Sequence, residues 1–276
     1  MSALLTSLQT PPSGRQRAVW FDNLGYCRDK LLAGRPVPWD SPGDLVGFYA
    51  KAQGMFSSDA LLVDLADLYA QFANDDALRD AMAARRRPGY PLRVLLSDET
   101  ARGRADQAVA ALTASAAVPV VLTLPSPARW LATATEQAGK TAGPPDADQA
   151  DTAAMYVADL LRLFAGARIA GLLLDEGSTP AADLVDPQAY ASVLKVAEHY
   201  EWPVFIRTDA APAWPRGTVS GVTGWVGAAP PAFPAPYWGL VAGEGEWGSA
   251  EGDLVLALVA PASDPETVMR DVRALG

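Results

Sequence analysis

The feature that most constrains this chain is the repeated alternation of short apolar segments with longer alanine-rich segments. The apolar segments are continuous runs of Val, Leu and Ile, whereas the alanine-rich segments space their apolar residues three or four positions apart. Continuous apolar runs are typical of strands covered on both faces, as in a parallel sheet, and the second spacing is typical of amphipathic helices. Repetition of strand then helix predicts an α/β fold built from βα units.

Eight segments are predicted as strands: 59–67, 91–99, 118–126, 168–177, 201–210, 218–226, 237–247 and 253–261. Their number and the chain length of 276 residues predict one (β/α)8 barrel of the TIM type, which we place at residues 29–276. Residues 1–28 are predicted to be a helical or irregular N-terminal extension. An open, doubly wound sheet is the alternative, although the glycine-rich phosphate loop that usually follows its first strand is missing.

Charge and composition limit the classes of partner. The net charge of −10 argues against nucleic acid and anionic membranes, because both are bound through basic surfaces. No apolar run reaches the roughly 18 residues of a membrane span. Near the N-terminus the basic residues follow a short apolar stretch, which is the reverse of the order in a signal peptide. We therefore expect a cytoplasmic protein that acts on a small molecule.

The chain is poor in the side chains that bind transition metals. Its single cysteine, Cys27, and its single histidine, His199, cannot supply a tetrahedral thiolate and imidazole zinc site. We expect neither zinc nor another cofactor. A magnesium site made by Asp175, Glu176 and Asp209 is left open, and it requires their carboxylate oxygens to converge.

Two segments in the middle of the chain carry a family resemblance. In AVPVVLTLPSPARWL an apolar strand ends in Ser-Pro and opens a helix, and in YVADLLRLFAGARIAGLLLDEGS a helix leads into a strand that ends in an acidic pair. Both resemble the superfamily that contains uroporphyrinogen decarboxylase and cobalamin-independent methionine synthase. The resemblance extends from about Asp29 to the C-terminus, and it implies a barrel enzyme of the lyase or methyltransferase type.

The chain departs from both branches of that superfamily. PVPWDSPGDLVGFY lacks the arginines that the decarboxylase branch has in this region, and no histidine follows His199. Where the methionine synthase branch has the His-x-Cys pair that binds zinc, this chain has Arg207-Thr208-Asp209. The resemblance therefore implies a divergent, zinc-independent member, and we expect neither porphyrin decarboxylation nor zinc-activated methyl transfer.

Candidate site residues follow from the rule that barrel enzymes place their active sites at the C-terminal ends of the strands. The predicted catalytic residues are Asp175, Glu176 and Asp209, and the predicted substrate-binding residues are Ser126, Arg129, Arg207, Trp225 and Glu244. Other acids at predicted strand ends are Asp64, Asp67, Asp98, Glu99 and Glu246. Converging carboxylates can supply an acid and a base, while arginines and a serine-capped helix N-terminus can hold an anion.

Side chains alternate along a strand, so one acid of the Asp175-Glu176 pair should face the barrel mouth and the other should point sideways. At least one should contact Arg129 or Arg207, because a carboxylate beside a buried strand needs a partner. The predicted function is a reaction of a small organic acid that uses these carboxylates. A non-catalytic barrel that binds a metabolite or a partner subunit is the alternative, and a homodimer is also left open.

Overall fold

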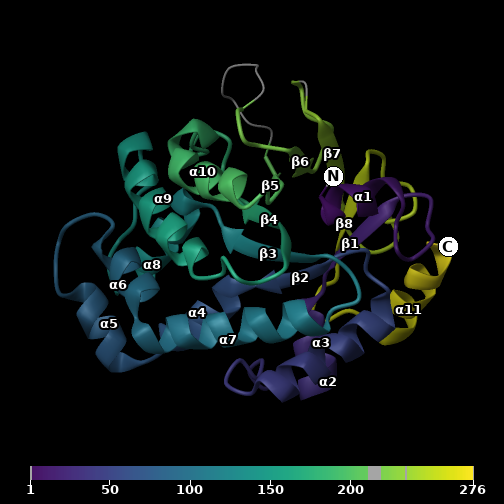
Figure 1. Ribbon diagram of the computed structural model, residues 1–276, viewed down its shortest axis with the longest axis horizontal. Coiled ribbons are helices and arrows are strands. Elements are labelled where there is room, and N and C mark those ends of the chain that lie inside the picture. The colour runs from purple at the N-terminus through teal and green to yellow at the C-terminus, as the bar shows by residue number, and fades with distance from the viewer. Residues whose placement is uncertain (1, 211–218, 234, 276) are drawn as a thin grey trace.

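The computed structural model describes residues 2–210, 219–233 and 235–275 of the chain. Eight parallel strands form one sheet in the order β1-β8-β7-β6-β5-β4-β3-β2. The edge strands β1 and β2 meet, so the sheet is a nearly closed barrel, with helices between the successive strands from β1 to β5 (Figure 1). The architecture is the predicted (β/α)8 barrel of the TIM type.

The strands are β1 Ala18–Asp22, β2 Leu61–Asp64, β3 Val120–Pro125, β4 Ile169–Asp175, β5 Val204–Thr208, β6 Gly224–Gly227, β7 Tyr237–Ala242 and β8 Leu254–Leu258. The helices are α1 Ala3–Gln9, α2 Leu24–Leu32, α3 Pro42–Phe56, α4 Leu65–Phe72, α5 Asp76–Ala83, α6 Tyr90–Ser97, α7 Glu99–Ser115, α8 Pro127–Gln137, α9 Ala147–Arg162, η1 Pro187–Tyr190, α10 Ala191–His199 and α11 Pro265–Ala274. Among the described residues, no helix is long and apolar enough to cross a membrane.

The structure confirms most of the predicted strands and corrects one. Segments 118–126, 168–177, 201–210 and 253–261 contain parallel strands of the sheet. The segment 218–226 contains β6, although residue 218 lies outside the described residues.

The prediction of a strand at 91–99 is wrong, because residues 90–97 form helix α6. Its buried residues Leu92, Leu95 and Leu96 lie on one helical face, and Gly89, with a φ of 81°, precedes the first turn. A short apolar run fits a buried helix as well as a strand. The eighth strand is instead β1, which lies inside the segment 1–28 that we expected to be an extension.

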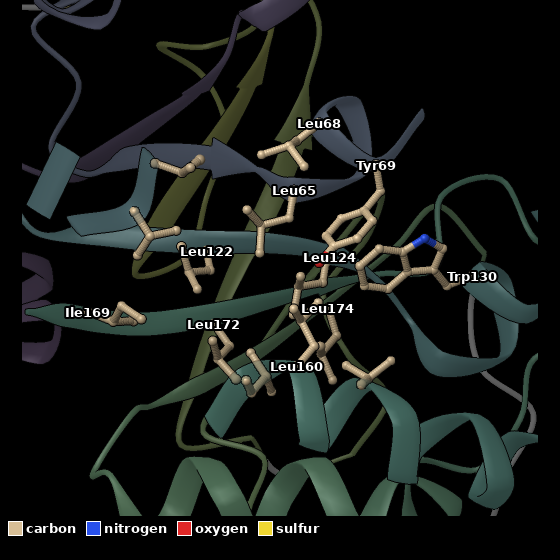
Figure 2. Packing of buried hydrophobic residues seen from close by; sticks show 14 of the residues in the cluster. Leu65, Leu68, Tyr69, Leu122, Leu124, Trp130, Leu160, Ile169, Leu172 and Leu174 are labelled. Carbon is tan, nitrogen blue, oxygen red and sulfur yellow. The ribbon is translucent and has the colours of Figure 1, made fainter. Parts of the chain in front are cut away.

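The larger part of the core lies between the sheet and the helices. Leu122 and Leu124 of β3 and Leu172 and Leu174 of β4 pack outward against apolar side chains of α4, α8 and α9 (Figure 2). The alternate residues of a strand point the other way. In this sheet they fill the barrel interior.

Helix α1 fills the N-terminal end of the barrel. Its Leu4 and Leu8 belong to the interior cluster, together with Trp20, Leu173 and other residues of the strands. Leu4 packs onto Gly171 near the start of β4, where a Cβ atom would clash with the Leu4 side chain. This end is closed by apolar packing, which leaves the C-terminal ends of the strands for a site.

We expect Leu4→Ala to lower the free energy of unfolding by about 2–4 kcal/mol, since a fully buried side chain would be replaced by a cavity. Urea unfolding followed by tryptophan fluorescence measures the change. Gln9→Ala, an exposed position on the same helix, is the control and should change the value by less than about 0.5 kcal/mol. Equal effects of the two substitutions would contradict a packing role for α1.

Candidate functional site

A cavity of about 120 Å³ lies at the C-terminal ends of the strands. Its volume corresponds to roughly four water molecules. Strands β1, β2 and β4 each end in an aspartate that lines it, and β5 contributes Arg207. The polar residues of the lining are Asp22, Asn23, Tyr49, Asp64, Thr123, Arg129, Asp175 and Arg207. We name this space the mouth cavity.

Asp175 holds both arginines of the mouth cavity. One carboxylate oxygen accepts a hydrogen bond from Nη1 of Arg129, and the other accepts from Nη1 of Arg207 at 3.2 Å. The second oxygen also accepts from the backbone N–H of Gly177 at 2.8 Å. Nη2 of Arg207 reaches on to Asp209 at 3.1 Å. The expected contact of an Asp175-Glu176 acid with Arg129 or Arg207 is thus confirmed.

Glu176 points into the wall of the barrel. It is 1% exposed, and its two oxygens accept hydrogen bonds from Ser126 Oγ at 2.6 Å and from the Tyr190 hydroxyl at 2.7 Å. Burial raises the pKa of Glu176, and these two hydrogen bonds lower it in part. Ser126 also caps α8 by accepting the backbone N–H of Arg129 at 3.1 Å. Neither Glu176 nor Ser126 is among the described residues that line the mouth cavity.

Asp22, at the end of β1, is a site residue that sequence reasoning missed. Its side chain lies deep in the barrel but is exposed to the mouth cavity. Within the described residues, no group donates a hydrogen bond to its carboxylate. The surrounding protein raises its pKa by desolvation, and the charge of Arg207 lowers it in part. Asp22 is therefore a carboxyl group open to a ligand.

Asp64, at the end of β2, is a buried carboxyl group with a strongly raised pKa. Burial raises its pKa to about 7, the backbone N–H of Ala66 lowers it, and the negative charges of Asp22, Asp67 and Asp175 raise it further. Its Oδ1 accepts that N–H at 2.8 Å as the N-cap of α4. At neutral pH the side chain therefore exists in both protonated and ionised forms, as a general acid or base requires.

Two further polar atoms of the lining residues, Thr123 Oγ1 and Arg207 Nε, are buried without a hydrogen-bond partner in the part of the chain that the structure describes. The Tyr49 hydroxyl is also buried and interacts with the backbone of Asp64. Cys27 also lines the cavity, but burial raises its pKa to about 12, so the thiol stays protonated and is a poor nucleophile.

Trp225 and Glu244, both predicted to bind substrate, lie at other places on the barrel. Trp225 packs edge-on against Phe233, with ring centroids 4.9 Å apart, beside the proline-rich segment 228–233. Glu244 accepts a hydrogen bond from the Ser263 hydroxyl. Neither is among the described residues that line the mouth cavity. The structure thus joins Ser126, Arg129, Asp175, Glu176, Arg207 and Asp209 in one network and leaves these two outside it.

Among the described residues, no group of three or more His, Cys, Asp or Glu side chains could hold a metal ion. The magnesium alternative required Asp175, Glu176 and Asp209 to converge. Asp175 and Asp209 instead accept hydrogen bonds from arginines and share Arg207, and Glu176 accepts hydrogen bonds from hydroxyl groups. The described part of the chain therefore offers no ligand set of this kind.

The sequence did contain a signal for the missed aspartate. Strands β1, β2 and β4 read AVWFD, LLVD and IAGLLLD, so each is an apolar run that ends in aspartate. Of these three aspartates, only Asp175 is among the predicted catalytic residues. Asp98 and Glu99 are the last two residues of the wrongly predicted strand 91–99, and they stand at the start of helix α7, where Asp98 is the N-cap.

Gly177 is required by the arginine network, and we expect Gly177→Ala to disturb it. The residue has a φ of 54°, and a Cβ atom there would lie 2.7 Å from Cζ of Arg129. Gly245→Ala is the matched control, because Gly245 has a φ of 82° and nothing within 4 Å of a Cβ. Backbone strain should cost each variant about 1 kcal/mol. Urea unfolding should show a greater loss for Gly177→Ala, and equal losses would contradict the close approach of Arg129.

We expect Asp64→Asn to gain stability relative to the wild type as pH rises from 4 to 8. A raised folded-state pKa means that the folded wild type keeps a proton that the unfolded chain releases, so its stability falls across this window. Asparagine does not titrate, and it preserves the helix cap. Urea unfolding at several pH values measures the difference, with Asp75→Asn at the exposed cap of α5 as control. A pH-independent difference would show that Asp64 titrates normally.

Comparison of the chain with protein-family models and with curated proteins finds no match. The resemblance to the superfamily of uroporphyrinogen decarboxylase and methionine synthase therefore stays a prediction, and the site must be interpreted from its own chemistry.

Proposed function

We propose that the protein is an enzyme that binds a small organic acid in the mouth cavity and that Asp64 transfers a proton to or from it. The observation that carries this proposal is a carboxyl group with a pKa of about 7 in a cavity that also presents Arg129 and Arg207. A general acid or base works best when its pKa lies near the working pH. The reaction is of the lyase or methyltransferase type, and it uses no zinc.

The arginines of the mouth cavity favour an anionic substrate. Arg129 and Arg207 face Asp175, and Arg207 also pairs with Asp209, so these charges balance when Asp22 and Asp64 are protonated. An incoming carboxylate raises the pKa of both acids and favours their protonated forms. Binding of the anion is therefore coupled to the uptake of protons that the reaction can use.

Other polar groups of the lining supply the remaining contacts. The Asn23 amide and the unused N–H groups of Arg129 and Arg207 can donate to an oxygen of the substrate. Burial holds the pKa of the Tyr49 phenol well above its ordinary value, so the phenol stays neutral. These groups are already fixed by the strands and helices that carry them, which lowers the cost of ordering them around a ligand. Asp175 acts through the arginines as a positioning residue.

The small volume of the cavity fits an acid of a few non-hydrogen atoms. The lyase form of the proposal is the decarboxylation of such an acid. In decarboxylation, the bond between the carboxylate and its carbon breaks, carbon dioxide leaves and the electron pair stays on the carbon. Protonated Asp64 donates its proton there and regains one from water.

The test begins with the ligand that co-purifies with the protein, identified by native mass spectrometry. That acid and a panel of two- to four-carbon carboxylates are then followed by NMR in D₂O for loss of substrate and for deuterium on carbon. We expect turnover of at least one acid, and Asp64→Asn should lower it about 100-fold. Arg129→Gln should weaken binding about tenfold, the usual effect of losing one charged hydrogen bond.

Asp75→Asn, at the exposed cap of α5, is the control for the loss of one carboxylate and should turn over like the wild type. Asp175→Asn should raise KM more than it lowers kcat, because Asp175 orients both arginines. Tight binding of an acid without turnover, unaffected by Asp64→Asn, would instead support the alternative of a non-catalytic barrel that binds a metabolite.

A further inference from the structure

A second and larger cavity lies on the other side of helix α3. Its volume is about 820 Å³, and its walls come from the end of α2, the loop before α3, and helices α3, α4 and α7. We name it the α3 groove. Its lining includes the aromatic residues Trp39, Phe48 and Phe72 and the cationic residues Arg35, Lys51 and Arg104.

The α3 groove is separate from the mouth cavity, although the two share a wall. Gly43, Gly47 and Lys51 of α3 line the groove, at the four-residue spacing of one helical face. Tyr49 of the same helix lines the mouth cavity, and Phe48 contributes to both linings. A ligand in the groove would therefore leave the arginine network of the mouth untouched.

The charges in the α3 groove are unusual for so acidic a chain. The whole sequence has 32 acidic and 22 basic residues, yet the groove presents three cations against the two carboxylates of Asp40 and Asp44. Asp44 accepts a hydrogen bond from the Ser41 hydroxyl at 2.8 Å. Within the described residues, none of the three cations forms an ion pair. They are thus available to an anion.

Two of the three cations, Arg104 and Arg35, donate hydrogen bonds to backbone carbonyls and keep other N–H groups free for a ligand. Arg104 Nη1 donates to the carbonyl of Asp40 at 2.8 Å, and Arg35 Nε donates to the carbonyl of Leu32 at 3.0 Å. These bonds fix each guanidinium group beside the groove without neutralising it. A fixed guanidinium group binds carboxylate and phosphate oxygens with charge-assisted hydrogen bonds.

The aromatic residues of the groove indicate that its ligand also has an apolar part. Trp39 is 3% exposed and Phe48 is 4% exposed, so both present only a small apolar surface to the groove from firmly packed positions. The volume lies in the range of about 300–1,000 Å³ that is typical of sites for drug-sized organic molecules. The groove therefore has room for a larger molecule than any acid that fits the mouth cavity.

We propose that the α3 groove binds an amphipathic organic anion. Its flat or aliphatic part lies against Trp39, Phe48 and Phe72, and its carboxylate, sulfonate or phosphate group binds Lys51 and Arg104. This binding site does not depend on the function that we propose for the mouth cavity.

The experiment uses 2-naphthoate as the probe and the full chain labelled with 5-fluorotryptophan. Calorimetry measures the affinity, and the ¹⁹F resonance of Trp39, assigned from Trp39→Phe, reports the place of binding. We expect one molecule per chain and a shift of the Trp39 resonance. Lys51→Gln and Arg104→Gln should each weaken binding about tenfold, and the neutral 2-naphthalenemethanol should bind at least about tenfold more weakly than 2-naphthoate.

Arg162→Gln, at an exposed position on α9, removes the same charge elsewhere and should leave the affinity unchanged. Asp64→Asn should also bind 2-naphthoate normally, so failure at the mouth cavity is distinguishable from failure at the groove. Absence of binding at millimolar probe, equal affinity for the neutral analogue, or loss of binding in Arg129→Gln alone would each overturn the proposal.

Discussion

The site depends on closure of the barrel between β1 and β2. A buried aspartate, Asp59, joins these two edge strands. Asp59 is fully buried, and its carboxylate accepts the backbone N–H of Val19 at 2.9 Å and that of Ser13 at 2.8 Å. Its own N–H donates to the carbonyl of Val19 at 2.9 Å. Ser58 Oγ accepts the N–H of Phe21 at 3.1 Å. Asp59 and Ser58 thus accept backbone N–H groups of β1 that a neighbouring strand would otherwise pair. These hydrogen bonds matter because a buried N–H group without a partner costs free energy.

This closure brings Asp22 and Asp64 to the same cavity. They end the two edge strands, and in an open sheet they would lie at opposite sides of the structure. Their proximity contributes to the raised pKa of Asp64, after the larger effect of burial. Because α1 fills the opposite end with Leu4 and Leu8, the barrel has one apolar end and one polar end. The acid–base chemistry that we propose is therefore a consequence of how the sheet closes.

The sequence predicts those strands whose local pattern is clear. Runs such as VPVVLTL and IAGLLLD are long enough, and flanked clearly enough by helical spacing, to identify β3 and β4. AVWFD ends in aspartate as β2 and β4 do, but it is short and follows a stretch rich in proline, glycine and arginine, so the alternation of strand and helix does not identify it as a strand. The run around Leu95 is predicted as a strand because a short apolar run fits either element, whereas the structure buries Leu92, Leu95 and Leu96 on one face of a helix.

The candidate site was predictable to the same extent. The contacts of Asp175 with Arg129 and Arg207 follow from three strand ends that meet at one end of a barrel. The partner of Glu176 was beyond prediction, because Tyr190 comes from η1, whose position depends on tertiary packing. The same is true of the raised pKa of Asp64, which arises from burial and from neighbours on other strands.

Helix α3 links the two cavities, because each of its faces lines one of them. Most helices of an α/β barrel pack one face on the sheet and expose the other to water. Here Tyr49 faces the mouth cavity, Lys51 faces the α3 groove, and Phe48 lies at the boundary between them. Phe48 is only 4% exposed, so one firmly packed side chain separates a ligand in the groove from a ligand in the mouth cavity.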